Sequence, residues 1–475
     1  MKTWMLSFLA CMIVAQTQAA PNILLLIGDN WSYEHAGANG DKAVSTPVFD
    51  RMCREGMRFT NAFCPVPSCS PTRSCIVTGR AAHQLEDAAS LWSKFPGKFR
   101  VFGDELTKAG WHVGFAGKGW SPGNYIDFGR ELNPAGAQFE DFPSFMQARK
   151  EKQPFFFWFG STHTSLNKWK AGTGKARGID PAKVRVPKSL PDVPEVREEI
   201  TDYLAQVELM DEAFGEAITL LEQNGELDNT VVIHTGDNGW QMPHGLAHCY
   251  DHGTRVPLAV RWPGKVKAGK VSDDFVSLTD LAPTSLEIAG LKPWPEMTAH
   301  SFVDVLTGKT SAVKRDRMFI ERERHANVRR GDLSYPVRGI RTTEYLYLHN
   351  LRPDRWPAGD PELYYSVGPY GDIDGSRTKL YMMAHADDPA VKPLFELSFG
   401  KRPAEELYDL KSDPDQILNL ANDPAYAKVK AGLATEVDTW MRETQDPRAA
   451  DPTTNVWDTY PYFGSLAKEL RDAKK

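Results

Sequence analysis

The sequence has few cysteines, no run of basic residues and, after its first 20 residues, no apolar run of membrane-spanning length. Six cysteines in 475 residues are too few for a fold built on disulfides. A net charge of −6 without a basic run argues against nucleic acid as the main partner. We therefore expect no nucleic-acid partner and no membrane span. The 41% hydrophobic and 25% charged residues are typical of a globular protein.

The first 20 residues have the pattern of a secretory signal peptide. Lys2 gives a positive start, an apolar run covers residues 4–15, and a short cleavage region ends at Ala20. The run is shorter than the roughly 20 apolar residues that cross a bilayer. A lipoprotein signal at Cys11 is the alternative, but the apolar run continues past that residue. We expect residues 1–20 to be removed and the mature protein to be secreted or periplasmic.

Apolar runs alternate with helical patterns over most of the chain. The run from Ile23 to Ile27 ends in Gly28-Asp29 and is typical of a strand buried on both faces. Further strands are expected at 114–116, 154–159, 230–235 and 258–262, and helices at 46–59, 74–78, 101–109 and 196–223. This alternation predicts βαβ units, and therefore an α/β fold with a large, mostly parallel sheet between helices.

The pattern changes after about residue 335. Strands expected at 338–341 and 345–349 form an antiparallel pair, and a stretch rich in Gly, Pro and Asp follows them. One more strand at 406–410 and a helix at 423–442 complete the chain. We therefore expect a large domain at residues 21–334 and a smaller α+β domain with an antiparallel sheet at 335–475.

Two Asp-Asn pairs follow expected strands. Asp29-Asn30 comes after the first strand and Asp237-Asn238 after the strand at 230–235. Ligands of open parallel sheets lie beyond the carboxyl ends of the strands, so the two pairs can converge. Their oxygens suit a hard cation such as Ca²⁺ or Mg²⁺. The alternative is that both pairs are ordinary strand-to-loop turns.

The segment Cys69-Ser70-Pro71-Thr72-Arg73, followed by Thr78-Gly79-Arg80, resembles the signature of the type I sulfatases. The similarity extends over nearly the whole mature chain, with matches at Asp29, Pro47, 58–62, 406–410, 413–414 and 419–420. Within that family the heparan N-sulfatase (sulfamidase) branch is most similar, with matches at 68–71, 334–338, 349–351 and 443–447. The resemblance implies an alkaline-phosphatase-like sulfatase fold whose catalytic domain is residues 21–334.

The resemblance also implies a chemistry. In this family a maturation enzyme, a partner during biogenesis, oxidises the signature cysteine to formylglycine (3-oxoalanine), here at Cys69. The hydrated aldehyde attacks sulfur, helped by one divalent cation, Ca²⁺ or Mg²⁺. By analogy, Arg73 and Lys118 steady the formylglycine and the sulfate. The implied activity is hydrolysis of sulfate esters or sulfamates on a sulfated carbohydrate. The implied cation ligands are Asp29, Asn30, Cys69, Asp237 and Asn238.

Three positions depart from the family pattern. Asn30 stands where a second acid is common, which removes one negative charge but leaves an oxygen ligand. Trp120 stands where Gly-Lys-x-His would place a histidine, and Leu246 where a Lys or Arg would contact sulfate. His163, after the strand at 154–159, is the candidate acid for the leaving group.

Histidines surround the position of the missing basic residue. His244 and His248 flank Leu246 and are candidates to replace it in substrate binding. The alternative for these two, and for His163 and His252, is that each is a hydrogen-bonded structural histidine. His234 lies inside an apolar strand, so we expect it in the core.

A basic cluster lies near the expected domain junction, at Arg322, Arg324, His325, Arg329 and Arg330. One interpretation is a solvated face. The other is a subsite for acidic sugars, in which Arg322 and His325 bind the substrate, since arginine pairs with carboxylate and sulfate groups.

Two other functions stay open at this point. A non-catalytic protein that binds sulfated glycans would explain the departures at Trp120 and Leu246. A phosphatase or phosphonate hydrolase of the same broad fold is the other, although such relatives typically use Ser or Thr and two metal ions.

Overall fold

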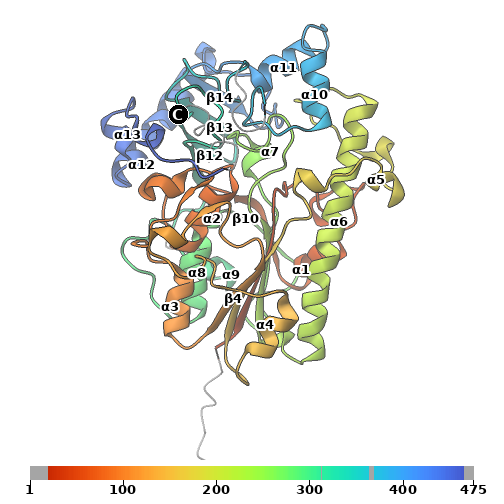
Figure 1. Ribbon diagram of the computed structural model, residues 1–475, viewed down its shortest axis with the longest axis vertical. Coiled ribbons are helices and arrows are strands. Elements are labelled where there is room, and N and C mark those ends of the chain that lie inside the picture. The colour runs from red at the N-terminus through yellow and green to blue at the C-terminus, as the bar shows by residue number, and fades with distance from the viewer. Residues whose placement is uncertain (1–19, 312, 363–367, 465–475) are drawn as a thin grey trace, which may run out of the picture.

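The computed structural model describes residues 20–311, 313–362 and 368–464, so the expected signal peptide, except Ala20, lies outside the described residues. A large sheet stands at the centre, with helices on both faces (Figure 1). Its eight strands have the order β10-β2-β9-β8-β1-β7-β4-β6. The strands are β1 (Asn22–Gly28), β2 (Met57–Phe63), β4 (His112–Gly117), β6 (Ala137–Gln138), β7 (Phe155–Ser161), β8 (Thr230–Gly236), β9 (Leu258–Arg261) and β10 (Lys270–Ser277).

The pairing is mostly parallel. Strand β1 lies between β7 and β8 and is parallel to both, and β4 is parallel to β7. Strand β9 is the exception, because it runs antiparallel to β8 and to β2. The expected α/β class with a mostly parallel sheet is confirmed.

Alternate residues of β1 enter two different cores, because successive side chains of a strand point to opposite faces. Ile23, Leu25 and Ile27 pack on one face, and Leu24 and Leu26 on the other. The first face is covered by α2 (Cys69–Thr78), α3 (Phe102–Lys108), α8 (Leu281–Ile288) and α9 (Val303–Leu306). The second is covered by α1 (Pro47–Glu55), α4 (Phe142–Ala148) and α6 (Pro194–Gln223), and α5 (Thr173–Ala176) packs on α6.

A second, antiparallel sheet has the order β11-β12-β13-β14. Its strands are β11 (Arg317–Arg322), β12 (Val337–Thr342), β13 (Tyr345–Asn350) and β14 (Glu405–Asp409), and α12 (Ala427–Glu443) packs on it. The other α-helices and strands of the described residues are β3 (Ser93–Lys94), β5 (Gly123–Asn124), α7 (Asp251–Thr254), α10 (Arg377–Ala384), α11 (Lys392–Phe399) and α13 (Pro447–Ala450). The expected antiparallel sheet is confirmed. The domain boundary after residue 334 stays a prediction, and β11 of this sheet lies before it.

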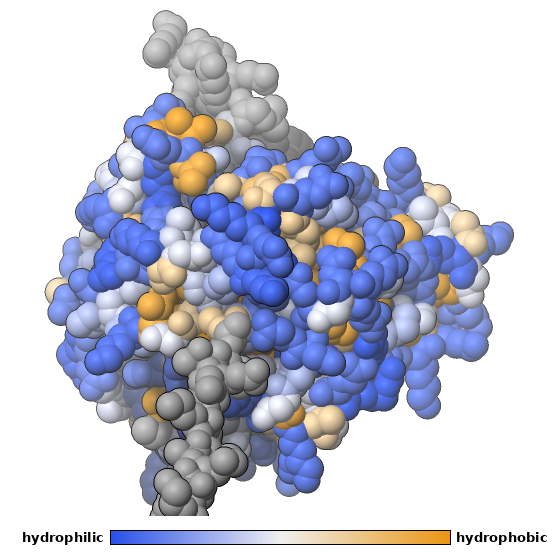
Figure 2. All heavy atoms as spheres, turned by 90° about the horizontal axis from the view of Figure 1, so that it is seen from below, coloured by the Kyte–Doolittle hydropathy of each residue, from blue (hydrophilic) through white to orange (hydrophobic). Residues whose placement is uncertain are grey.

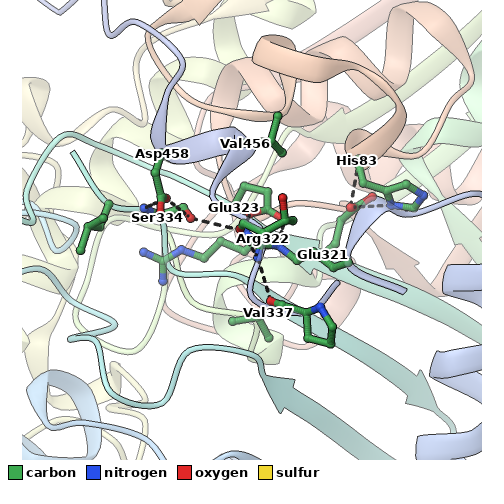
Figure 3. Close-up of polar contacts among 12 residues, drawn as sticks. His83, Glu321, Arg322, Glu323, Ser334, Val337, Val456 and Asp458 are labelled. Atoms are coloured by element: carbon green, nitrogen blue, oxygen red, sulfur yellow. Dashed lines mark hydrogen bonds and ion pairs between the residues drawn. The ribbon is translucent and has the colours of Figure 1, made fainter. Parts of the chain in front are cut away.

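A junction network of buried ion pairs joins the second sheet to the segment after α2. Its members are His83, Glu321, Glu323, Arg338, Asp446 and Arg448. Figure 3 labels His83, Glu321 and Glu323. Glu321 accepts hydrogen bonds from the backbone of Ala82 and His83, just after α2. Glu323 lies 2.7 Å from Arg338 Nη2 and 2.8 Å from Arg448 Nε. The network therefore fastens the second sheet to the end of the helix that begins at Cys69.

Two of the helix predictions are wrong at one end. The helix expected at 46–59 ends at Glu55, because Gly56 breaks it and strand β2 begins at Met57. The helix expected from residue 74 begins at Cys69. Pro71 does not prevent this early start, because the first turn of a helix has no intrahelical partner for its N–H groups.

Hydrophilic residues cover most of the described surface on the face shown in Figure 2, and the apolar residues there are scattered. No helix among the described residues is long and apolar enough to cross a membrane. The five cysteines of the described chain are free and buried.

Candidate active site

The carboxyl ends of β1, β7, β8 and β4 lie side by side at one edge of the large sheet. Gly28 of β1 is in register with Ser161 of β7 and Gly236 of β8, and β4 ends beside β7. The next residues in the chain are Asp29, Asp237 and Lys118, so these side chains start from neighbouring positions. This is the edge at which open parallel sheets bind ligands.

Cys69 is the first residue of α2, and its thiol faces the end of β1. The Sγ atom lies 3.4 Å from Asp29 Oδ1 and 3.8 Å from Asn30 Oδ1. Burial, together with the negative charge of Asp29, raises the pKa of the Cys69 thiol well above its usual value. The unmodified side chain is therefore a neutral thiol that donates to Asp29.

Two basic side chains pair with the two carboxylates of the site. Arg73 lies one helical turn after Cys69, and its Nε is 2.9 Å from Asp237 Oδ2. Lys118 Nζ is 2.5 Å from Asp29 Oδ1. Burial opposes the ionisation of Asp29, but Lys118 and Arg73 outweigh it and hold the pKa of this carboxyl well below its usual range. Burial raises the pKa of Asp237 to about 6.

The side chains at this edge fit a hard cation. Ligand atoms of Asp29, Cys69 and Asp237 all lie within 4.8 Å of one another. Among the described residues, no other set of three or more His, Cys, Asp or Glu side chains comes this close together. The amides of Asn30 and Asn238 adjoin them. Asn238 Oδ1 is buried and has no hydrogen-bond partner in the described part of the chain. A buried oxygen without a partner is costly, and a bound cation would satisfy it.

The loop after β7 is tied to Asp29. Ser165 Oγ donates to Asp29 Oδ2 at 2.5 Å, and Thr164 Oγ1 donates to the Asp29 carbonyl. His163 precedes them and is partly exposed, with its backbone N–H 3.3 Å from Ser161 Oγ. The structure therefore places His163 on the loop that holds Asp29, and its role as the acid stays a prediction.

His244 and His248 are buried beside Tyr250. The His244 ring stacks on Tyr250 with 3.9 Å between centroids, and His248 Nδ1 lies 3.2 Å from the Leu246 carbonyl. Burial lowers the pKa of His248 to about 3 and that of His244 well below its usual value. Both rings are therefore neutral at neutral pH and do not restore the positive charge that Leu246 lacks. Their contact with substrate stays a prediction.

The other two histidines of interest have structural surroundings. His252 Nδ1 lies 2.7 Å from Glu34 Oε1, and its Nε2 lies 3.5 Å from Asp415 Oδ1. His234 is fully buried against Trp31 and Phe49, as expected for a core residue.

The basic cluster near the junction is not a solvated face, because four of its five residues are buried: Arg322, Arg324, His325 and Arg329. Arg322 and Arg329 each place Nη2 2.5 Å from Asp372 Oδ2, so Asp372 neutralises part of their charge. His325 Nδ1 lies 2.8 Å from Ser68 Oγ, next to Cys69. His325 thus lies near the site, whereas Arg322 is committed to Asp372. Substrate binding by either residue stays a prediction.

Trp120 fills the position of the absent histidine as a core residue. Its indole is buried, and Nε1 donates to Ser74 Oγ at 2.7 Å, five residues after Cys69 in α2. Leu246 is also buried. Neither side chain can take over the polar role expected at its position.

Sequence reasoning missed three polar residues of the site. Ser165 binds Asp29, Gln241 binds Asn30, and Asp374 binds Gln241. Gln241 stands three residues after Asn238, which is a signal that closer inspection of the loop could have found. Nothing in the sequence near Asp374 indicates its position beside this site.

Comparison with known proteins is consistent with this geometry. The family model described as Sulfatase matches residues 21–125 and 136–291, and the model described as N-sulphoglucosamine sulphohydrolase, C-terminal, matches 240–361. Human N-sulphoglucosamine sulphohydrolase is 28% identical, covering 93% of this chain and 94% of that protein. An ulvan-active sulfatase of Formosa agariphila is 26% identical, covering 90% of this chain and 75% of that protein.

Solved structures share the fold. One, described as in complex with its substrate D-glucosamine-2-N,6-O-disulfate, has a TM-score of 0.61 at 19% identity and covers 91% of this chain and 99% of its own. The phosphonate monoester hydrolase of Agrobacterium radiobacter has a TM-score of 0.63 at 17% identity, covering 90% and 97%. The fold alone therefore does not separate these activities, but the Sulfatase model matches more than half of the chain. This chain belongs to the sulfatase family of hydrolases and is similar to N-sulphoglucosamine sulphohydrolase.

Proposed function

We propose that this chain hydrolyses a sulfate ester or sulfamate of a sulfated carbohydrate, and that an oxidised Cys69 and one divalent cation take part. The position of Cys69 carries the proposal. Its Sγ lies 3.4 Å from Asp29 Oδ1, at the start of a helix whose next turn supplies Arg73. When present, a formylglycine at this position supplies a hydrated aldehyde as the nucleophile, and a Ca²⁺ or Mg²⁺ ion supplies positive charge beside it.

The residues of the site are arranged to receive an anion. Asp29, Asn30, Asp237 and Asn238, with the side chain at position 69, would hold the cation. Two carboxylates balance the two basic groups Arg73 and Lys118, so a divalent cation makes the site positive overall. Positive charge fixed in a buried site stabilises the charge that develops on sulfate oxygens during the reaction.

Arg73 and Lys118 have separate tasks in this proposal. Arg73 Nη1 donates to the carbonyls of Lys118 and Gly119, so it fixes the start of the loop after β4. Lys118 Nζ then stands over Asp29, where it can bind a sulfate oxygen. His163 would donate a proton to the leaving oxygen or nitrogen from the loop that holds Asp29.

N-sulfated glucosamine is the first candidate substrate. The human relative is named for this substrate, and the C-terminal model of the same enzyme matches residues 240–361. The ulvan-active relative keeps O-sulfated polysaccharides as a second candidate class. The N-terminal apolar run supports export, so we propose that the protein meets its glycan in the periplasm or outside the cell.

The test is mass spectrometry of the tryptic peptide Phe59–Arg73 from protein co-expressed with a formylglycine-generating enzyme. We expect an aldehyde at Cys69 and an unmodified thiol at Cys64, an internal control in the same peptide. The converted protein should release sulfate from N-sulfated glucosamine or, for an O-sulfatase, from 6-O-sulfated glucosamine.

An unmodified Cys69, next to a control sulfatase that is converted, would contradict the proposal. Binding of sulfated oligosaccharides by that unmodified protein would instead support a non-catalytic glycan-binding function. Trp120 and Leu246 are the observations that favour this second function, because both replace polar groups of the family pattern with buried apolar side chains.

A further inference from the structure

Gln241 lies beside the candidate cation site, and its amide orientation is set by the backbone. Its Oε1 accepts a hydrogen bond from the Leu166 N–H at 2.6 Å and a second from Asn30 Nδ2 at 2.9 Å. Its Nε2 donates to Asp374 Oδ2. A backbone N–H can only donate, so Gln241 must turn its oxygen toward Leu166 and Asn30. Asn30 must in turn present its NH₂ group to Gln241.

Asn238 is fixed from the opposite side. Its Nδ2 donates to the Gly239 carbonyl at 2.9 Å and to Asn30 Oδ1 at 2.7 Å. A carbonyl can only accept, so the nitrogen of Asn238 is held there and its Oδ1 is left without a partner in the described chain. The amides of Gln241, Asn30 and Asn238 are therefore linked by hydrogen bonds in series, and backbone groups fix the orientation of the amides at both ends.

The orientation of these three amides decides which atoms face the cation. It turns Asn30 Oδ1 toward Cys69, 3.8 Å from Sγ, and leaves Asn238 Oδ1 free to bind. The reversed Asn30 amide would present an NH₂ group to a positive ion. A carboxylate at position 30 would need no such control, because its two oxygens are equivalent.

We propose that Gln241 is a positioning residue for the cation site, which allows a neutral amide at Asn30 to serve where a carboxylate would otherwise stand. Asp374, before α10, assists by accepting from the other end of the Gln241 amide. The inference rests on the proposed function, since the cation belongs to that proposal.

The experiment measures Ca²⁺ binding by calorimetry to the full chain, after EDTA treatment, in a double-mutant cycle. Gln241→Leu removes the orienting oxygen at similar volume and should weaken Ca²⁺ binding by roughly 10-fold or more, the range found for residues that orient metal ligands. In an Asn30→Asp background the same Gln241→Leu change should leave the Ca²⁺ affinity unchanged. The orienting oxygen of Gln241 is then unnecessary and lies against a carboxylate. Gln147→Leu, at an exposed position on α4, is the matched control and should match wild type.

Several results would overturn the inference. Equal Ca²⁺ affinity of wild type and Gln241→Leu would show that Gln241 does not act on the site, with the proposed function intact. Equal losses in the wild-type and Asn30→Asp backgrounds would show a merely structural role, and thermal unfolding without Ca²⁺ would report that damage. A wild-type protein that carries the aldehyde and releases sulfate but binds no divalent cation would refute this inference and the proposed cation site. The proposed sulfatase activity would stand.

Discussion

Two clusters of buried charge in this molecule look alike and differ in one respect. The junction network and the candidate active site both bring acids and bases from distant parts of the chain together away from solvent. In the junction network every carboxylate oxygen of Glu321, Glu323 and Asp446 accepts a hydrogen bond. In the candidate site Asn238 Oδ1 has no partner in the described chain. A structural cluster typically has all of its buried polar atoms paired. A buried oxygen without a partner is instead typical of a site that binds a further group.

The largest expected effect removes the reactive side chain of the site. Cys69→Ala should lower sulfate release by at least about 1000-fold, because no other side chain there can be converted to the aldehyde. Its free energy of unfolding should change by only about 1 kcal/mol, as for many single substitutions. Cys75→Ala, in the same helix but facing the apolar core, should retain activity. Substantial turnover by Cys69→Ala would remove the proposed mechanism.

The opposite pattern is expected for the junction network. Glu323→Ala leaves Arg338 and Arg448 without their shared carboxylate and should cost roughly 3–5 kcal/mol of unfolding free energy. Activity per folded molecule should stay near wild type. Glu436→Ala breaks a more exposed pair with Arg317 and should cost about 1 kcal/mol or less in the same urea titration. Equal losses for the two variants would refute the structural role assigned to the network.

His163→Ala tests a smaller and more selective effect. We expect kcat/KM for a sulfated sugar to fall by about 100-fold, since the sugar oxygen or nitrogen needs a proton as it leaves. Nitrophenyl sulfate has a better leaving group and should be hydrolysed at nearly the wild-type rate. His385→Ala, far along the chain in an exposed pair with Asp388, is the control. An equal loss on both substrates would exclude His163 as the acid.

The most gradual effect concerns pH. Although burial opposes it, Glu34 and Asp415 raise the pKa of His252 to about 10. A raised pKa in the folded state means that the stabilisation is complete below the unfolded value, about 6.5, and is lost as pH rises toward 10. Stability should therefore fall over this interval, by at most about 1.4 kcal/mol per pH unit from this group. Urea titrations across that interval should show a shallower slope for His252→Gln, and an unchanged slope would mean that other groups dominate.

Much of the fold was predictable from local pattern. The strands β1, β7 and β8 are mostly apolar and buried along nearly their whole length, and such runs form the centre of a parallel sheet. The long helix α6 begins and ends within two residues of its prediction. Strand β2 was missed because the expected helix was extended past Gly56 to Phe59. Pairing with β9 and β10 makes Met57–Phe63 a strand.

The residues of the site were predictable to the extent that their chemistry follows local features. Asp29, Asp237 and Lys118 each directly follow a strand, and Cys69 and Arg73 belong to one signature, so residue type and topology together predicted their neighbourhood. The basic cluster was different. Its charges were visible in the sequence, but the acid that neutralises Arg322 and Arg329, Asp372, lies 50 and 43 residues further along the chain.

By itself, the sequence determined the sheet class and the residue types that meet at the strand ends, because these depend on short-range periodicity and on the ends of parallel strands. Only the tertiary structure decided which charges are consumed in pairing and which polar atoms stay open. Asn30, Gln241 and Asp374 come from three separate segments, and hydrogen bonds among them depend on atoms brought within about 3 Å by packing. No spacing in the chain encodes such a distance, so the orientation of the Asn30 amide emerged only from the folded structure.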